Sequence, residues 1–190
     1  AWQEYGYTSY SLAVAGVPGN LYQSMLKEVQ KRQSPKLVVF EVNGFLQGDD
    51  YFAREGQLHT WLDNIPWSEN KIETIKEMIP ENEQYSYFCK IAAAHNNWKD
   101  IGQVANCTAI KARMDLNGYS YTKGFGTYTK SCDNVRSSKE KKIQFTEKSQ
   151  AYLSELLQYC RDSGVEHVLF VRFPHGRKIK NPEVLDQVAD

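Results

Sequence analysis

Residues 11–43 read SLAVAGVPGNLYQSMLKEVQKRQSPKLVVFEVN, and this stretch decides the expected fold. A short apolar run at 11–15 leads into turn-forming residues at 16–20, after which apolar side chains recur at helical spacing over 21–32. Pro35 ends that helix, because the residue before a proline is disfavoured in the α region. The β-branched run 36–43 is typical of a buried parallel strand, whose sheet carries helices on both faces. The stretch therefore predicts a strand–helix–strand unit.

The ends of the two predicted strands are the first place to expect a functional site. Open α/β sheets bind ligands beyond the carboxyl ends of their strands, and here those ends are Gly16 and Asn43. Glu41 interrupts the second apolar run, and a buried carboxylate is costly unless it is paired. We expect Glu41 to form a structural ion pair with Arg172; a catalytic acid is the alternative.

The rest of the chain extends this plan to an α/β fold. Helices are predicted at 69–79, at 82–104 and, capped by Thr146, at 146–162, and a second buried strand at 165–172. Short helices and loops are expected over 51–70. We predict one domain over residues 1–190, with a three-layer α/β/α architecture around a mainly parallel, flavodoxin-like sheet and a helical and loop insertion at about 46–142.

Composition narrows the classes of partner. Lysine and arginine together number 23, as do aspartate and glutamate, so the net charge of zero argues against a nucleic-acid partner. The run 137–142 is interpreted as a solvated surface segment. No apolar run of about 18 residues occurs, so no membrane span is expected within these residues.

The end of the given sequence falls inside a predicted helix. This helix is expected to begin with Asn181 as its N-cap and Pro182 at its first position, shortly before the last residue, Asp190. We therefore expect the chain to be a piece of a longer protein.

The four cysteines do not suggest a metal site. None belongs to a Cys-x-x-Cys pair, which argues against a zinc or thioredoxin-like site. Cys160 lies in a helical pattern and is expected to be buried as a small hydrophobe. Cys107 and Cys132 bracket the least regular region and either form a disulfide or remain free, since sequence alone does not establish pairing.

Two blocks resemble a known family. Residues 5–16 and 35–41 are similar to the second and third blocks of SGNH (GDSL-type) hydrolases. They are most similar to the bacterial envelope-associated branch, which includes D-alanine transfer and polysaccharide O-acetylation proteins. Residues 168–174 resemble a later strand of that group. The resemblance implies acyl transfer by Ser, His and Asp, with no metal and no organic cofactor.

The resemblance carries over to individual residues. Gly16 matches the oxyanion glycine, and Asn43 is the nearest counterpart of the oxyanion asparagine, although the chain reads Glu-Val-Asn-Gly where the family has Gly-x-Asn-Asp. His95 and Trp98 form a His-x-x-Trp similar to one in related envelope proteins; a core histidine is the alternative. Tyr121 of the tyrosine-rich loop and His175 are expected to bind substrate, with a simple turn residue as the alternative for His175.

The two remaining catalytic blocks have no counterpart here. No Gly-Asp-Ser block precedes Tyr5 and no Asp-x-x-His follows Pro174, so we predict that these residues alone do not hydrolyse p-nitrophenyl acetate. The resemblance implies an ester hydrolase or O-acyltransferase acting on bacterial cell-envelope or exported glycans, in an extracytoplasmic or envelope-associated location. The alternative is a non-catalytic binding or assembly module that has lost the triad. A nucleotide or flavin binder, which would carry an ultraviolet-absorbing ligand, is a third interpretation.

Overall fold

The computed structural model describes residues 2–14, 16–89, 137–173 and 177–189. The chain divides into two compact units. The smaller comprises Ala1–Ala15 and Phe88–Asp133, and its described part includes a 3-10 helix at Trp2–Tyr5. The main unit comprises Gly16–Tyr87 and Asn134–Asp190. The single-domain organisation and the limits of the insertion stay predictions.

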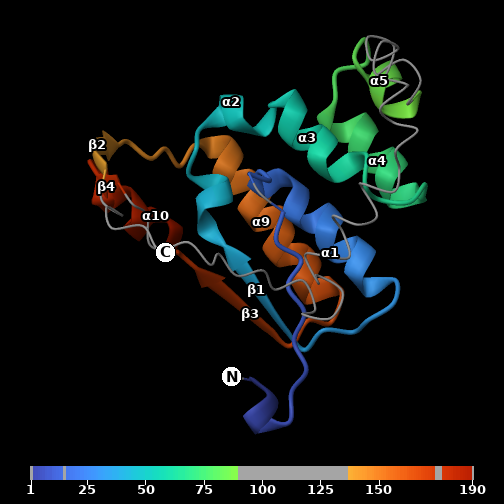
Figure 1. Cartoon of the computed structure of the whole chain (residues 1–190), viewed down its shortest axis with the longest axis horizontal. Helices are drawn as coiled ribbons and strands as arrows, with labels where there is room; N and C mark the ends of the chain where they lie inside the picture. Colours follow the sequence, from blue (N-terminus) through green and yellow to red (C-terminus); the bar gives the residue numbers. More distant parts are fainter. Residues whose placement is uncertain (1, 15, 90–136, 174–176, 190) are drawn as a thin grey trace, which may run out of the picture. The chain divides into compact units, whose positions relative to one another are not determined.

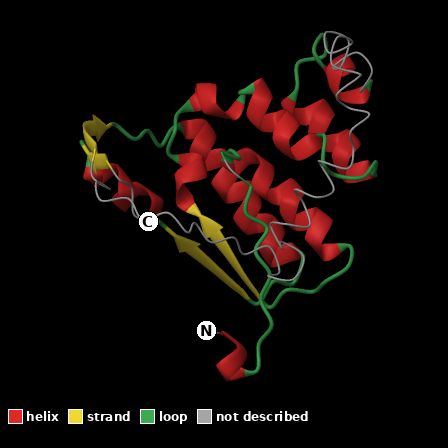
Figure 2. Cartoon of the chain, in the orientation of Figure 1, coloured by secondary structure: helices red, strands yellow, loops and turns green. Residues whose placement is uncertain are grey.

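The main unit is built on a parallel strand pair. Strand β1 (Leu37–Glu41) lies beside β3 (His167–Val171) in parallel, with Val39 opposite Leu169 (Figures 1 and 2). Both strands were predicted from their β-branched runs. The mixed α/β character of the chain is thus confirmed.

Helices account for most of the remaining described structure. The α-helices are α1 (Tyr22–Gln30), α2 (Asp49–Phe52), α3 (Glu55–Leu62), α4 (Glu69–Met78), α5 (Gln84–Phe88), α9 (Glu147–Asp162) and α10 (Asp186–Ala189). Short 3-10 helices are η2 (Gly19–Leu21), η3 (Val42–Phe45) and η5 (Pro182–Leu185). The predicted helices at 21–32, 69–79 and 146–162 are confirmed, and Thr146 caps α9 by accepting a hydrogen bond from the Ser149 amide. Of the predicted helix 82–104, α5 is observed; residues from 90 onward lie outside the described part.

The core lies on one face of the β1–β3 pair. Phe40 is buried there against Leu26 of α1 and Leu156 of α9, with Phe45 and Cys160 in the same cluster. The opposite face carries Val39 and Leu169, each 46% exposed. These two side chains are exposed, and the second helical layer of the expected three-layer architecture stays a prediction.

The predicted first strand is not observed. Residues 11–14 lie outside any strand and are half-buried or exposed, and Ala15 lies outside the described residues. A short apolar run forms a strand only where another backbone pairs with it, and periodicity alone does not supply that partner. Gly16 therefore follows an irregular segment rather than a strand.

A second strand pair was missed by the sequence analysis. Strand β2 (Ser137–Lys141) pairs in parallel with β4 (Arg177–Ile179), with a shift of register between them, so the run interpreted as a solvated segment forms a strand in which Glu140 is exposed. Asn181 does not cap η5 with its side chain. Its carboxamide instead binds the Ile143 backbone twice, accepting from N–H at 3.0 Å and donating to C=O at 2.8 Å.

Candidate functional site

The carboxyl edge of the β1–β3 pair gathers polar groups. Because the strands are parallel, their carboxyl ends lie at one edge. There β1 ends at Glu41 and turns at once into η3, which carries Asn43. Phe173, two residues beyond β3, contributes a backbone N–H that hydrogen-bonds the Glu41 carboxylate.

Two glycines let the start of α1 touch this turn. A Cβ at Gly44 would lie 2.9 Å from the Gly19 amide nitrogen and 2.5 Å from the Tyr22 hydroxyl, and one at Gly19 would lie 2.5 Å from the Phe45 ring. Neither position accepts a side chain without a shift of its neighbours. Tyr22 adds a hydrogen bond from its hydroxyl to the Glu41 carbonyl at 2.9 Å. The turn after β1 is thus packed tightly against the segment that opens α1.

Asn43 and Glu41 form the central pair of the site. The Asn43 Nδ2 donates a hydrogen bond to Glu41 Oε1. Asn43 is 9% exposed, and its Oδ1 is buried with no partner among the described residues. Burial raises the pKa of the Glu41 carboxyl, and this outweighs the hydrogen bonds from Asn43 and Phe173 and the charge of Lys141, which act in the opposite direction. The predicted ion pair with Arg172 is not among the ion pairs of the described residues.

Gly16 lies close to this edge, although not at a strand end. Its φ of +72° suits glycine, and its carbonyl accepts a 2.6 Å hydrogen bond from the Tyr51 hydroxyl. Three residues of chain span at most about 11 Å, so Gly16 stays near Gly19, which contacts the η3 turn. The structure therefore brings Gly16 and Asn43 to the same end of β1.

The other predicted site residues lie outside the described residues: His95, Trp98, Tyr121 and His175. The same is true of Cys107 and Cys132, whose pairing stays open. The roles expected for His95, Trp98, Tyr121 and His175 stay predictions. Cys160 is buried, as predicted, and burial raises the pKa of its thiol.

Lys141 was missed by the sequence analysis. Its side chain is half-buried at the end of β2 and close enough to feel the charges of Arg177 and Glu41. Burial first, and then Arg177, lower the pKa of the Lys141 ammonium, while Glu41 opposes them. The signal in the sequence was the run 137–142, whose pairing with the basic segment 177–180 was not foreseen.

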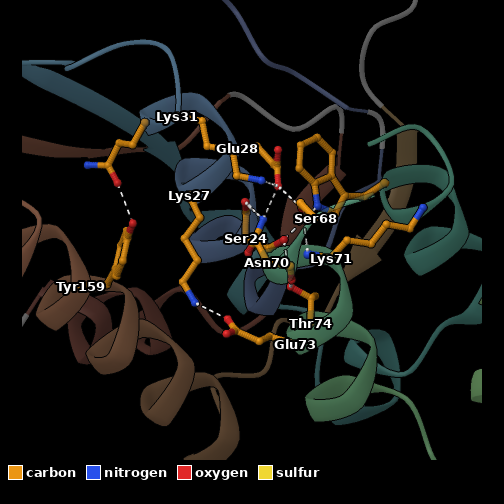
Figure 3. Close-up of polar contacts among 12 residues, drawn as sticks. Ser24, Lys27, Glu28, Lys31, Ser68, Asn70, Lys71, Glu73, Thr74 and Tyr159 are labelled. Carbon is orange, nitrogen blue, oxygen red and sulfur yellow. Dashed lines mark hydrogen bonds and ion pairs between the residues drawn. The ribbon is translucent and has the colours of Figure 1, made fainter. Parts of the chain in front are cut away.

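A second polar cluster joins α1 to α4 (Figure 3). The Asn70 Nδ2 donates to the Ser24 carbonyl at 3.1 Å and to Glu28 Oε1 at 2.7 Å. Trp61 Nε1 donates to the Ser24 hydroxyl at 3.2 Å, and the Ser24 and Thr74 hydroxyl oxygens lie 3.1 Å apart. Ser24, Asn70 and Thr74 are each less than a tenth exposed. This arrangement joins the two helices and is closed to solvent.

Glu28 of α1 contributes its carboxylate to this cluster (Figure 3), and the side chains that donate hydrogen bonds to it determine its pKa. Burial alone would raise the pKa of Glu28, but hydrogen bonds from Asn70, Lys31 and Ser68 together lower it. Ser68 also caps α4 by accepting a bond from the Lys71 amide. Glu28 thus remains ionised and holds the start of α4 against α1.

His59 lies in α3, within the range 51–70 where short helices and loops were expected. Its ring stacks on Tyr87 with centroids 3.9 Å apart, while Nδ1 lies 3.0 Å from an Asp63 carboxylate oxygen and Nε2 lies 3.6 Å from Glu55. Burial and the neighbouring carboxylates raise the pKa of the Tyr87 hydroxyl. The two carboxylates face opposite ring nitrogens, so they do not converge on one point. Across the described ranges, no three His, Cys, Asp or Glu side chains gather as metal ligands would.

The chemistry of the β1 edge is that of hydrogen-bond donation and charge. A carboxamide oriented by a carboxylate, beside glycine backbone, can donate to a developing oxyanion. Among the residues that the structure describes, no serine hydroxyl hydrogen-bonds a histidine ring, so the edge by itself shows no activated nucleophile.

Comparison with protein-family models, with curated proteins and with solved structures finds no match to this chain. Within the described part of the chain, no helix combines the length and the apolar character needed to cross a bilayer. The function is therefore argued from the residues and their geometry.

Proposed function

We propose that this chain is part of an SGNH-type ester hydrolase or O-acyltransferase that acts on bacterial cell-envelope or exported glycans outside the cytoplasm. In this proposal its main unit belongs to a three-layer α/β/α domain. The observation that carries the proposal is the buried Asn43 carboxamide, held by Glu41 at the carboxyl end of a parallel strand. The proximity of Gly16 to the same strand end supports it.

In the proposed reaction the β1 edge stabilises charge. The second Asn43 Nδ2 proton and the Gly16 amide would donate to the oxyanion of the tetrahedral intermediate, where preorganised donors have their largest effect. Ser, His and Asp would supply the nucleophile and its base, as in the resembling family. His95, Trp98, Tyr121 and His175 are proposed to line the acceptor cleft, and no metal or organic cofactor takes part.

A kinetic experiment tests the role of Asn43. The protein is expressed together with about fifty codons on either side of these residues, where a Gly-x-Ser and an Asp-x-x-His are expected, and assayed with p-nitrophenyl acetate. Replacing Asn43 with alanine should lower kcat about 100-fold with little change in KM, the usual effect of removing one oxyanion donor. Asn64→Ala is the matched control, because Asn64 is exposed and its side chain bonds only the Thr60 carbonyl among the described contacts.

Two outcomes would contradict the proposal. Turnover by the 190 residues alone, above a heat-inactivated sample, would mean that the nucleophile has been misplaced. Equal kcat for Asn43→Ala and Asn64→Ala, in samples that circular dichroism shows to be folded, would remove Asn43 from the oxyanion site.

A non-catalytic binding or assembly module that keeps the fold and has lost the triad is the second candidate. It is favoured by the Asn43 amide being engaged by Glu41 and by the lack of a bonded Ser–His pair in the described residues. This candidate predicts no Gly-x-Ser and no Asp-x-x-His in the flanking coding sequence and no turnover of any ester, with glycan binding retained.

A further inference from the structure

A concentrated basic surface lies on the β2–β4 pair. We define the basic surface as Lys141, Lys142, Arg177, Lys178 and Lys180. The last four are exposed, and Lys141 is half-buried. In Figure 1, β2 and β4 lie side by side at the end of the main unit that also carries α10.

The backbone fixes these five residues in one place. The parallel pairing sets Lys141 opposite Ile179, and the Lys180 amide donates to the Lys141 carbonyl at 2.9 Å. Just beyond, the double hydrogen bond between Asn181 and Ile143 ties the two segments together again. Ile143 is buried in the core, with Ile179 packed against it, so the pair is anchored to the main unit. Two segments far apart in sequence thus present their cations on one small sheet.

The basic surface holds an excess of positive charge, although the Glu41 carboxylate lies near Lys141 and opposes part of it. Residues 140–142 and 177–180 hold five cations and one carboxylate, Glu140, whereas the whole chain has no net charge. None of the ion pairs between described residues involves the five cations. Burial first, and then the nearby charge of Arg177, lower the pKa of the Lys141 ammonium group. An added anion would relieve that repulsion.

We propose that the basic surface binds a polysaccharide that bears carboxylate or phosphate groups. Charge complementarity carries the inference, and the choice of a glycan rests on the proposed function. Single-stranded nucleic acids bind where aromatic side chains interleave with the cations, and a membrane surface favours exposed apolar side chains beside them. The seven residues that make up this part of the sheet contain no aromatic side chain, and their one apolar residue, Ile179, packs against the core.

Titration calorimetry of the 190-residue chain tests the surface. The probes are polygalacturonate for carboxylates, a phosphodiester-bearing mannan for phosphates, and neutral dextran. The triple variant Lys142→Gln, Lys178→Gln, Lys180→Gln should bind the preferred anionic probe about tenfold more weakly than the unmodified chain, since each exposed pair contributes modestly. The control triple Arg32→Gln, Lys76→Gln, Lys148→Gln removes the same charge from exposed positions elsewhere and should change binding less than twofold.

Each outcome decides the proposal. A loss confined to the first triple variant supports it, and the stronger of the two anionic probes identifies the group recognised. Equal losses in both triples, binding of dextran as tight as that of the anionic glycans, or tighter binding of anionic lipid vesicles or single-stranded RNA would overturn it. The measurement needs no turnover, so a failure of the esterase proposal leaves this result readable, and a failure here leaves the Asn43 experiment unaffected.

Discussion

Two polar clusters in the main unit hold a half-buried carboxylate in opposite ways. Between α1 and α4, Glu28 receives hydrogen bonds from three side chains, and the pKa of its carboxyl lies below the ordinary value. At the carboxyl edge of β1, Glu41 receives bonds from Asn43 and Phe173, yet burial prevails and its pKa lies above the ordinary value. The first environment stabilises the ionised carboxylate and the second disfavours it.

This difference separates a structural cluster from a candidate site. An ionised carboxylate that accepts hydrogen bonds from its neighbours contributes to stability, and Glu28 with its three donors is such a group. Groups whose ionisation is disfavoured by their surroundings occur preferentially where chemistry takes place, because function rather than stability maintains them. A buried carboxamide oxygen without a described partner occurs in both clusters, at Asn43 and at Asn70, so the distinction rests on the opposite pKa shifts and on the position of Glu41 at the end of a parallel strand. This difference in ionisation is our reason for proposing the functional site at β1 and a stabilising role for the α1–α4 contact.

The largest effect is expected from reversing the polarity of the α1–α4 cluster. Asn70→Asp keeps the side-chain shape but replaces two donated hydrogen bonds with a buried carboxylate beside Glu28 and the Ser24 carbonyl. The free energy of unfolding at pH 7 should fall by about 3 kcal/mol, measured by urea denaturation. Asn64→Asp, at an exposed position, should cost less than about 1 kcal/mol. Equal losses for the two variants would show that the cluster contributes nothing beyond a surface contact.

A smaller effect is expected from Glu28, and it should depend on pH. Because its folded-state pKa is lowered, the stability that it contributes is present above about pH 4.5 and is lost as pH falls through the folded value. Glu28→Gln should therefore lower the free energy of unfolding by about 1–2 kcal/mol at pH 7, and by almost nothing near pH 3. Urea denaturation at both pH values checks this. A difference that is the same at both would contradict the assignment.

The sequence predicted elements well where one stretch carries all the information. Apolar periodicity and the Thr146 cap are enough to predict α9 from its own residues. Strands β1 and β3 are predicted in the same way from their β-branched runs. The run 11–15 has the same appearance but no strand partner among the described residues. Strand β2 was missed for the converse reason, since its polar sequence pairs with a segment almost forty residues away.

The candidate site shows the same limit. Gly16 and Asn43 were identified by their positions in sequence, and both lie at the same end of β1. The role of Glu41 depends on a local side-chain bond from Asn43, and that of Lys141 on the charges of Arg177 and Glu41, which come from other segments of the chain. The expected Arg172 partner for Glu41 followed from the need to pair a buried charge. In the structure, hydrogen-bond donors from Asn43 and Phe173 stabilise the Glu41 carboxylate in part. The sequence pattern alone does not distinguish such donors from a charged partner.

The smallest effect, and the sharpest contrast with Glu28, is expected from Glu41. Its folded-state pKa is raised, so its contribution to stability is present below about pH 4.5 and is lost as pH rises through the folded value. Glu41→Gln keeps an oxygen that can accept the Asn43 hydrogen bond but cannot ionise. The variant should match the unmodified chain near pH 4 and exceed its free energy of unfolding by less than about 1 kcal/mol at pH 7. We would measure the unfolding free energy of Glu28→Gln, of Glu41→Gln and of the unmodified chain by urea denaturation over the same pH series. The difference between variant and unmodified chain should fall with rising pH for Glu28→Gln and rise with it for Glu41→Gln. Slopes of the same sign would mean that the two carboxylates occupy equivalent environments, and the reason for placing the functional site at β1 would be lost.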